Sequence, residues 1–234
     1  MIPPAAQPAS DLGAAGRRRA QLLRSGAQPV HGAGAAAAPP LSIADVHALR
    51  RNRSTPARAA LAAKFGRQYD SLIEGETRSL AESILRLLTR DLAKSVRQAL
   101  AEAVAASPNL PHGVVTQMAR DAIEVARPLL ERSPVLSDED LAEIVRTHAV
   151  PYALAVAGRE HLSEYLSDVV AVAGDAEVVA RLAGNAGAKI APETLTRMAE
   201  DYRHDRSVQD RLVRRPALPD DLVDRMVNSC VSGA

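Results

Sequence analysis

The feature that most constrains this chain is a repeat of 26 to 28 residues that runs from residue 96 to the end. An apolar residue, followed by Pro, Ser or Ala and a short polar stretch, recurs as Leu110-Pro111, Leu136-Ser137, Leu162-Ser163, Ile190-Ala191 and Leu218-Pro219. Successive anchors lie 26, 26, 28 and 28 residues apart. Such a fixed period is typical of repeat architectures, in which one small unit is stacked several times.

Each unit is predicted to be two short helices separated by a break. After each anchor, apolar residues at i, i+3 and i+4, as at Leu141, Ile144 and Val145, form a helical stripe rather than a strand alternation. A similar stripe precedes each anchor. The predicted breakers between the two stripes are Pro108, Pro134, Pro216, Gly158, Gly184 and Gly187. Proline cannot donate a helical hydrogen bond, and glycine readily adopts the turn that closes a helix.

The start of each second helix is rich in capping and acidic residues. Ser137, Ser163 and Pro219 are good first residues for a helix. The acidic side chains of these first turns are Asp138, Glu139, Asp140, Glu164, Glu193, Asp220 and Asp221. Each stabilises the positive end of the helix dipole by about 0.3–1 kcal/mol, so we interpret them as structural rather than catalytic.

Two short helices cannot bury their own apolar stripes, so neighbouring units must stack. We therefore predict an all-α fold, an α-solenoid (a HEAT-like superhelix) of two-helix repeats of 26–28 residues. Residues 1–40 are expected to be a disordered, basic, Ala/Gly/Pro-rich tail, residues 41–95 the N-terminal helices of the array, and residues 96–234 five helix pairs.

The less regular N-terminal helices have their own signals. Ser42 is a candidate cap for a helix over 43–51, and a second helix is expected from Ser54 to Tyr69. A third is expected over 76–88, with one face formed by Leu80, Ile84, Leu87 and Leu88.

The net charge of +1 conceals an asymmetry along the chain. Residues 1–69 contain ten basic and two acidic side chains, whereas residues 70–234 contain 19 basic and 26 acidic ones. This division predicts a basic tail on an acidic folded body. Either the tail is simply solvated, or it contacts phosphate or an acidic surface such as the body itself. We prefer a bacterial N-terminal extension, or a misplaced start codon, over a transit peptide, and we expect a cytoplasmic protein without a membrane span.

Composition and motifs argue against catalysis. The chain has four Tyr, one Phe and no Trp, which removes most of the ring surface that cofactor pockets and single-stranded nucleic-acid binders use. Cys230 stands alone, and no P-loop, GxSxG or GxGxxG motif occurs. The six histidines, none in a known ligand spacing, are His31, His47, His112, His148, His161 and His204. We therefore expect no catalytic residues, no metal and no cofactor.

Arginines recur around the end of the first helix of each unit. The candidate interaction residues are Arg127, Arg132, Arg159, Arg181, Arg211, Arg214 and Arg215. One interpretation is that they pair with the acidic second-helix starts or with carbonyl groups at the first-helix ends. The other is an arginine ladder that binds an acidic partner. The sequence leaves both open.

Three segments carry a family resemblance. They are Gly75 to Thr77 with Leu80 to Asp91, Val96 to Glu102, and Val125 to Leu136. Further matches are Asp175 to Val179, Asn185, and Arg215 to Leu218. They resemble an uncharacterised group of bacterial, mainly alphaproteobacterial, proteins with a domain of unknown function, similar to HEAT-like and leucine-rich-repeat-variant arrays. The resemblance covers roughly residue 41 to the C-terminus and implies a helical superhelix without an established active site. Longer members continue past Ala234, so the last unit is either self-capped or a docking surface.

These observations lead to a functional expectation. We expect a non-enzymatic protein-interaction scaffold that uses a helical-repeat surface in bacterial signalling or cell-cycle regulation, with another protein as its partner. The alternative is nucleic-acid binding through the basic tail or through an arginine-lined concave face. A small enzyme of an unrecognised type is the third hypothesis.

Overall fold

The structure, a computed structural model, describes residues 47, 51, 54–73, 77–215 and 218. Over these residues the chain forms eleven α-helices and no strand, so the predicted all-α class is confirmed. The predicted tail (1–40) and the second half of the last repeat, including Cys230, lie outside the described residues.

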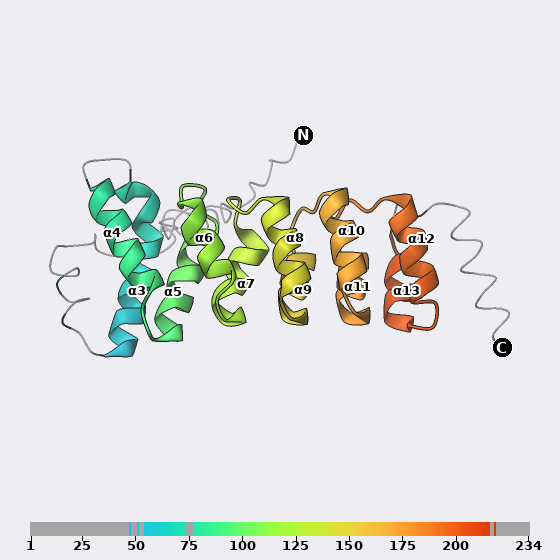
Figure 1. Ribbon diagram of the computed structural model, residues 1–234, viewed down its shortest axis with the longest axis horizontal. Coiled ribbons are helices and arrows are strands. Elements are labelled where there is room, and N and C mark those ends of the chain that lie inside the picture. The colour runs from blue at the N-terminus through green and yellow to red at the C-terminus, as the bar shows by residue number, and fades with distance from the viewer. Residues whose placement is uncertain (1–46, 48–50, 52–53, 74–76, 216–217, 219–234) are drawn as a thin grey trace, which may run out of the picture. The chain divides into compact units, whose positions relative to one another are not determined.

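The helices follow one another in chain order (Figure 1). They are α3 (Thr55–Leu72), α4 (Arg78–Thr89), α5 (Lys94–Val104), α6 (His112–Ala119), α7 (Ile123–Arg132), α8 (Asp138–Thr147), α9 (Val150–Ala157), α10 (Glu164–Ala173), α11 (Ala176–Ala183), α12 (Pro192–Asp201) and α13 (Arg206–Val213). Most helices after α5 are only eight to ten residues long, too short to be stable in isolation, so packing must hold them in place.

Packing follows a regular scheme among these helices. Each odd-numbered helix from α3 to α11 contacts the next odd-numbered one, and α4 contacts α6 as α8 contacts α10 and α10 contacts α12. Even-numbered helices also contact the odd-numbered helix that follows them in the chain, as α6 contacts α7 and α8 contacts α9 (Figure 1). Each helix pair therefore packs mainly against the pairs directly before and after it.

The core is continuous from α3 to α13 and consists almost entirely of aliphatic side chains. Leu100, Leu129 and Leu166 are fully buried within it. Each such side chain contributes about 1.5–3 kcal/mol through burial. The only aromatic stacking pair among the described phenylalanine and tyrosine rings joins Phe65 and Tyr69 of α3, edge to face at 5.8 Å. Small aliphatic side chains allow these short helices to pack closely.

The apolar face of α4 is rotated from the one that the sequence suggested. The predicted face consisted of Leu80, Ile84, Leu87 and Leu88. Ile84 and Leu88 are buried, but Leu80 is 46% and Leu87 59% exposed. Ala81 and Leu85 are buried in their place, which completes an i, i+3, i+4, i+7 stripe. Alanine is only weakly hydrophobic, so Ala81 did not mark the buried stripe in the sequence. Leu80 and Leu87 are more hydrophobic, so the prediction chose the face that contains them.

Capping residues begin several of the helices. Ser137 forms a capping box with Asp140 at the start of α8, and the Ser163 side chain accepts a hydrogen bond from the Leu166 amide in α10. Asp175 and Asp205 cap α11 and α13 in the same way. These side chains satisfy amide groups that the first turn of a helix leaves without partners.

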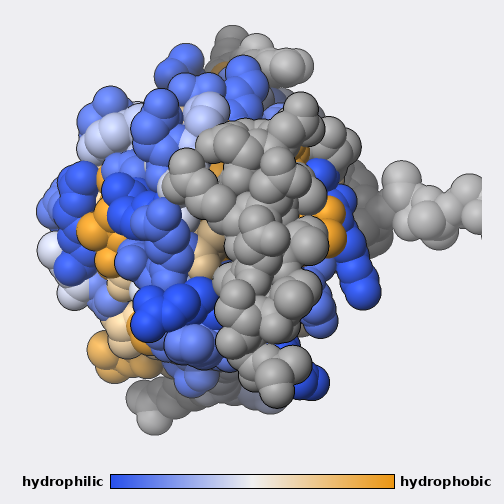
Figure 2. Space-filling model, turned by 90° about the vertical axis from the view of Figure 1, so that its right-hand side faces the viewer, coloured by the Kyte–Doolittle hydropathy of each residue, from blue (hydrophilic) through white to orange (hydrophobic). Residues whose placement is uncertain are grey.

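Most of the visible described surface is hydrophilic where the array is viewed from the end that carries α12 and α13 (Figure 2). Small hydrophobic patches interrupt it. Exposed apolar side chains in the described part of the chain include Val172 of α10 and Val213 of α13, which are 66% and 62% exposed. None of the described helices has the length and apolar character that crossing a membrane requires.

Candidate interaction site

The candidate arginines come from the odd-numbered helices α7, α9, α11 and α13 or from the residues directly after them. We call the C-terminal ends of these four helices and the residues that follow, 130–136, 157–163, 183–190 and 211–215, the C-terminal edge. The last carbonyl groups of any helix lack partners within that helix, so this edge concentrates backbone acceptors and negative dipole ends.

Arg159 follows the C-cap residue of α9 and reaches back to α7. Its guanidinium donates to the carbonyl groups of Leu130 at 2.6 Å and Ser133 at 2.8 Å. Burial lowers the pKa of Arg159, but an arginine remains charged because its ordinary pKa lies far above neutrality. This arginine therefore satisfies the end of the preceding odd-numbered helix.

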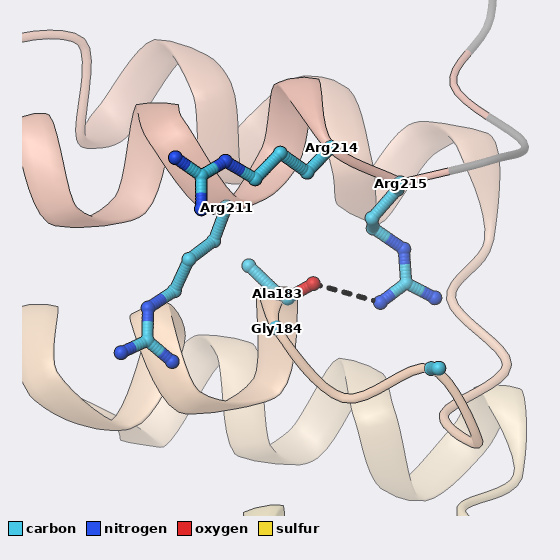
Figure 3. Close-up of a pocket in the computed structure, with 6 residues that line it drawn as sticks. Ala183, Gly184, Arg211, Arg214 and Arg215 are labelled. Atoms are coloured by element: carbon cyan, nitrogen blue, oxygen red, sulfur yellow. Dashed lines mark hydrogen bonds between the residues drawn. The ribbon is translucent and has the colours of Figure 1, made fainter.

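Arg215 occupies the equivalent place after α13. Its guanidinium donates to the carbonyl group of Ala183, the last residue of α11, at 3.0 Å (Figure 3). It also donates to the carbonyl groups of Asn185 at 2.9 Å and Ala188 at 2.8 Å, which follow α11. Burial lowers the pKa of this guanidinium as well. For Arg159 and Arg215, the structure thus supports the pairing of arginine with carbonyl groups at first-helix ends.

Asn185 fills the intermediate position and was missed as a site residue in the sequence. Its amide donates to the carbonyl groups of Ala157 at 2.9 Å and Arg159 at 2.7 Å, while its oxygen accepts from the Gly187 amide at 2.9 Å. The available signal was its place directly after Gly184, just as Arg159 follows Gly158. We call Arg159, Asn185 and Arg215, with the carbonyl groups that they bind, the carbonyl ladder.

The loops of the C-terminal edge also meet through their backbones. Leu162 and Ala188 form an isolated parallel bridge, and the Lys189 amide donates to the Leu162 carbonyl at 3.0 Å. A Cβ atom on Gly187 would lie 1.7 Å from the Glu160 carbonyl oxygen, so only glycine fits this approach. Loops one repeat apart are therefore in direct contact.

Arg181 and Arg211 lie across the C-cap glycines of the preceding odd-numbered helices. A Cβ atom on Gly158 would lie 2.3 Å from Arg181 Nη2, and one on Gly184 would lie 2.9 Å from Arg211 Nη1. Both arginines are exposed. The same side-chain arrangement thus occurs twice along the edge, once at α9 and once at α11.

The remaining candidate arginines are also exposed. Arg127 lies in the middle of α7 and Arg132 at its end. The pKa of Glu124 is lowered, first by the hydrogen bond from Lys94 and to a smaller degree by the charge of Arg127. Arg214 is the C-cap residue of α13.

Two cavities open along the C-terminal edge. One of about 340 Å³ is lined by Ala183, Gly184, Ala186, Arg211, Arg214 and Arg215 (Figure 3). The other, of about 570 Å³, is lined by Ala106, Glu131, Arg132, Pro134, Gly158, Arg159, Glu160 and His161. The first has three arginines and no carboxylate in its wall, whereas the second has basic and acidic groups together. The first cavity is therefore the stronger candidate for binding an anionic group.

Arginines outside this edge behave differently. Arg58 forms a two-bond pair with Asp91 at 2.8 and 3.0 Å, and Arg97 forms one with Asp121 at 2.5 and 2.8 Å. The hydrogen bond from Arg97 lowers the pKa of Asp121. Both carboxylates lie in the turns that lead into odd-numbered helices, at the opposite end from the C-terminal edge. These arginines join neighbouring units and are fully engaged.

Among the residues that the structure describes, no three His, Cys, Asp or Glu side chains lie close enough together to hold a metal ion. Of the described histidines, His112 bonds Asp140 of α8 at 2.8 Å, and His161 is exposed 3.8 Å from Glu160. The His112 contact links α6 to α8, so its geometry is that of a bond between helices.

Comparison with known proteins gives one match. A family model described as an uncharacterised protein conserved in bacteria (DUF2336) matches residues 125–233, from α7 to beyond α13. No curated protein and no solved structure matches the chain. The matched region contains the carbonyl ladder and all seven candidate arginines. Over that region, the chain is similar to a conserved bacterial domain of unknown function.

Proposed function

We propose that this chain is a non-enzymatic protein-interaction scaffold, built as an α-solenoid of HEAT-like helix pairs. It acts in the bacterial cytoplasm, in signalling or cell-cycle regulation, and its partner is another protein. The kinship with HEAT-like and leucine-rich-repeat-variant arrays, and with alphaproteobacterial proteins, is part of the same proposal.

The carbonyl ladder is the observation that carries this proposal. Arg159, Asn185 and Arg215 each follow an odd-numbered helix and each bond the end of the preceding one. A contact that recurs with the repeat fixes how one helix pair sits on the next. Proteins that stack like units in this way gain a long continuous surface, which suits the binding of a partner.

The distribution of side chains also favours binding over catalysis. Two of the most buried arginines bond backbone carbonyls rather than converging on a reactive group. The exposed candidate arginines are instead spread over α7, α11 and α13 and the residues after them, as the charged groups of a binding surface are. Catalysis requires acid, base or nucleophile groups held within hydrogen-bond reach of one another around a pocket.

Nucleic-acid binding is the second candidate, and the charge distribution favours the tail as its site. Residues 1–69 contain ten basic and two acidic side chains, but residues 70–234 contain 26 acidic against 19 basic ones. A backbone of closely spaced phosphates is attracted to the first segment and repelled by the second. Arg159 and Arg215 are engaged by carbonyl groups, which leaves fewer arginines for an arginine-lined face.

Affinity capture with the full chain, in the cell that produces it, tests the scaffold proposal. We expect one protein to be retained and, once purified, to bind the chain saturably. A matched chain without residues 1–40 separates the tail from the folded body, because a scaffold surface in the body keeps its partner. A partner lost with the tail, together with salt-sensitive binding to DNA, would support the nucleic-acid alternative instead.

A further inference from the structure

We propose that Arg181, Arg211 and Arg214 form a binding site for an extended acidic segment of a partner protein. The site lies at the C-terminal halves of α11 and α13 and the residue that follows α13. This inference rests on the proposed scaffold function and names the chemistry of its partner.

The first argument is that these three cations have no partner of opposite charge. All three are exposed, and in the described part of the chain none forms an ion pair. Elsewhere in the same array, Arg97 is paired with Asp121, Arg120 with Glu143 and Arg197 with Asp168. No carboxylate of the described residues therefore neutralises the charge of these three arginines.

The second argument is that the helix ends below the site are already satisfied. Asn185 bonds the Ala157 carbonyl at the end of α9, and Arg215 bonds the Ala183 carbonyl at the end of α11. The positive charges of Arg181 and Arg211 are therefore not needed as hydrogen-bond donors for those carbonyl groups. Their charge faces the solvent, where an added anion can meet it.

The third argument is that Arg181 and Arg211 each lie against the glycine that ends the preceding odd-numbered helix. Arg181 packs over Gly158 and Arg211 packs over Gly184, each where a Cβ atom would collide with the guanidinium. Arg211 and Arg214 border the cavity of about 340 Å³ from two directions (Figure 3). An arginine held in one place loses less side-chain entropy when it binds a carboxylate, and its planar fork can bind the two oxygens together.

Spacing identifies the shape of the ligand. Arg181 and Arg211 extend from neighbouring helices, α11 and α13, which pack against each other. Packed helices lie about 8–10 Å apart. An extended segment in the polyproline II conformation advances about 3.1 Å per residue with three residues per turn, so carboxylates three residues apart lie on one face about 9 Å apart and match this interval. We therefore expect a segment with Glu or Asp at i and i+3, lying across the two helices.

Charge favours such a peptide over a nucleic acid. Asp210 and Glu177 flank the arginines in the sequence of the same two helices, and residues 70–234 are acidic overall. Isolated carboxylates can pair with the arginines and avoid these neighbours, whereas a continuous row of phosphates cannot. The chain also has no Trp to stack bases.

Fluorescence anisotropy with the full-length protein tests the site. The probe is a labelled Gly/Ser peptide with three Glu residues at i, i+3 and i+6, and its companion has Gln at those positions. The test variant is Arg181→Gln/Arg211→Gln. The control variant, Arg67→Gln/Arg90→Gln, removes the same charge from exposed arginines of α3 and the end of α4.

We expect the Glu peptide to bind and the Gln peptide not to bind. The affinity should fall about tenfold or more in the test variant and less than about twofold in the control, because only close charge pairs have large coupling. Equal affinity in the test variant and the wild type would overturn the site. A labelled oligothymidylate of equal charge would also overturn the proposal if it bound the wild type more tightly than the Glu peptide does and lost as much affinity in the test variant. The site would then prefer phosphate.

The test variant also separates this inference from the scaffold proposal. If the protein captured by the wild-type chain is retained equally by Arg181→Gln/Arg211→Gln, the arginine site is wrong and the scaffold stands. If the wild-type chain captures no saturable partner, the scaffold proposal fails, whatever the peptide result.

Discussion

Arg215, which follows the C-cap residue of α13, donates a hydrogen bond at 3.0 Å to the carbonyl group of Ala183, the last residue of α11. The bond joins two helices that are one repeat apart in the sequence and packed side by side. Arg159 makes the same kind of bond to α7. In such an arrangement, the stability of each unit depends on the contact with its neighbour, so local changes at these contacts have measurable effects on the whole chain.

Substitution of Arg159 should reveal the strength of this contact. In Arg159→Met, the carbonyl groups of Leu130 and Ser133 lose their donors. Leaving buried acceptors unsatisfied costs about 1–3 kcal/mol, so the free energy of unfolding in urea should fall by that amount. Arg132→Met is the matched control, because Arg132 is exposed and should change stability by less than about 0.5 kcal/mol. Equal effects of the two substitutions would show that the ladder contributes nothing.

Glycine substitutions provide a second comparison. In Gly187→Ala, the added Cβ would lie 1.7 Å from the Glu160 carbonyl oxygen, so the backbone must shift and stability should fall by about 1–3 kcal/mol. In Gly113→Ala, within α6, nothing lies within 4 Å of the new Cβ. That variant should gain about 0.4–1 kcal/mol, since alanine restricts the unfolded chain. Thermal unfolding of both variants measures the difference, and a stabilised Gly187→Ala would contradict the loop contact.

Acid should weaken the pair between Arg97 and Asp121. The hydrogen bond from Arg97 lowers the pKa of Asp121 below its ordinary value of 3.8. A lowered pKa means that the stabilisation is complete above 3.8 and is lost as the pH falls through the folded-state value. The stability difference between wild type and Asp121→Asn should therefore be constant above about pH 5 and shrink as the pH falls below 3.8. Urea unfolding over this range provides the measurement, and a constant difference would show that this carboxylate is not involved.

The capping box of α8 predicts a smaller effect. Ser137 accepts from the Asp140 amide, and the Asp140 carboxylate accepts from the Ser137 amide. Ser137→Ala should lower the free energy of unfolding by about 1 kcal/mol, because one amide of the first turn loses its acceptor. Ser95→Ala, at an exposed position inside α5, should not destabilise the chain, because alanine is the better helix former. A loss at Ser95 equal to that at Ser137 would contradict the cap.

The sequence predicted the helical class and several helix starts because these depend on local signals. The stripe at Leu141, Ile144 and Val145 is buried in α8 as expected, and Ser163 caps α10. On α4, the same reasoning chose the wrong face, because Ala81 has too little hydrophobicity to mark the buried side. Local periodicity therefore identifies a helix better than it identifies the face that the helix buries.

The roles of the arginines could not be separated from the sequence. Arg159 bonds carbonyl groups and Arg181 lies exposed across a glycine, yet both are arginines near the end of a first helix. Which role each takes depends on the distance to a helix one repeat away, and the sequence does not contain that distance. Asn185 was missed because it is the only asparagine in a position that arginine occupies in two other units.

Site-specific photo-crosslinking in the producing cell tests the scaffold most directly. A photoreactive residue would replace Val213 beside the proposed site, Val172 on α10, or Leu87 on α4, all exposed and at different places on the array. The account predicts that the chain with the probe at Val213 forms one specific crosslinked complex with another protein. A result in which all three positions give only background, while the chain remains folded, would contradict it.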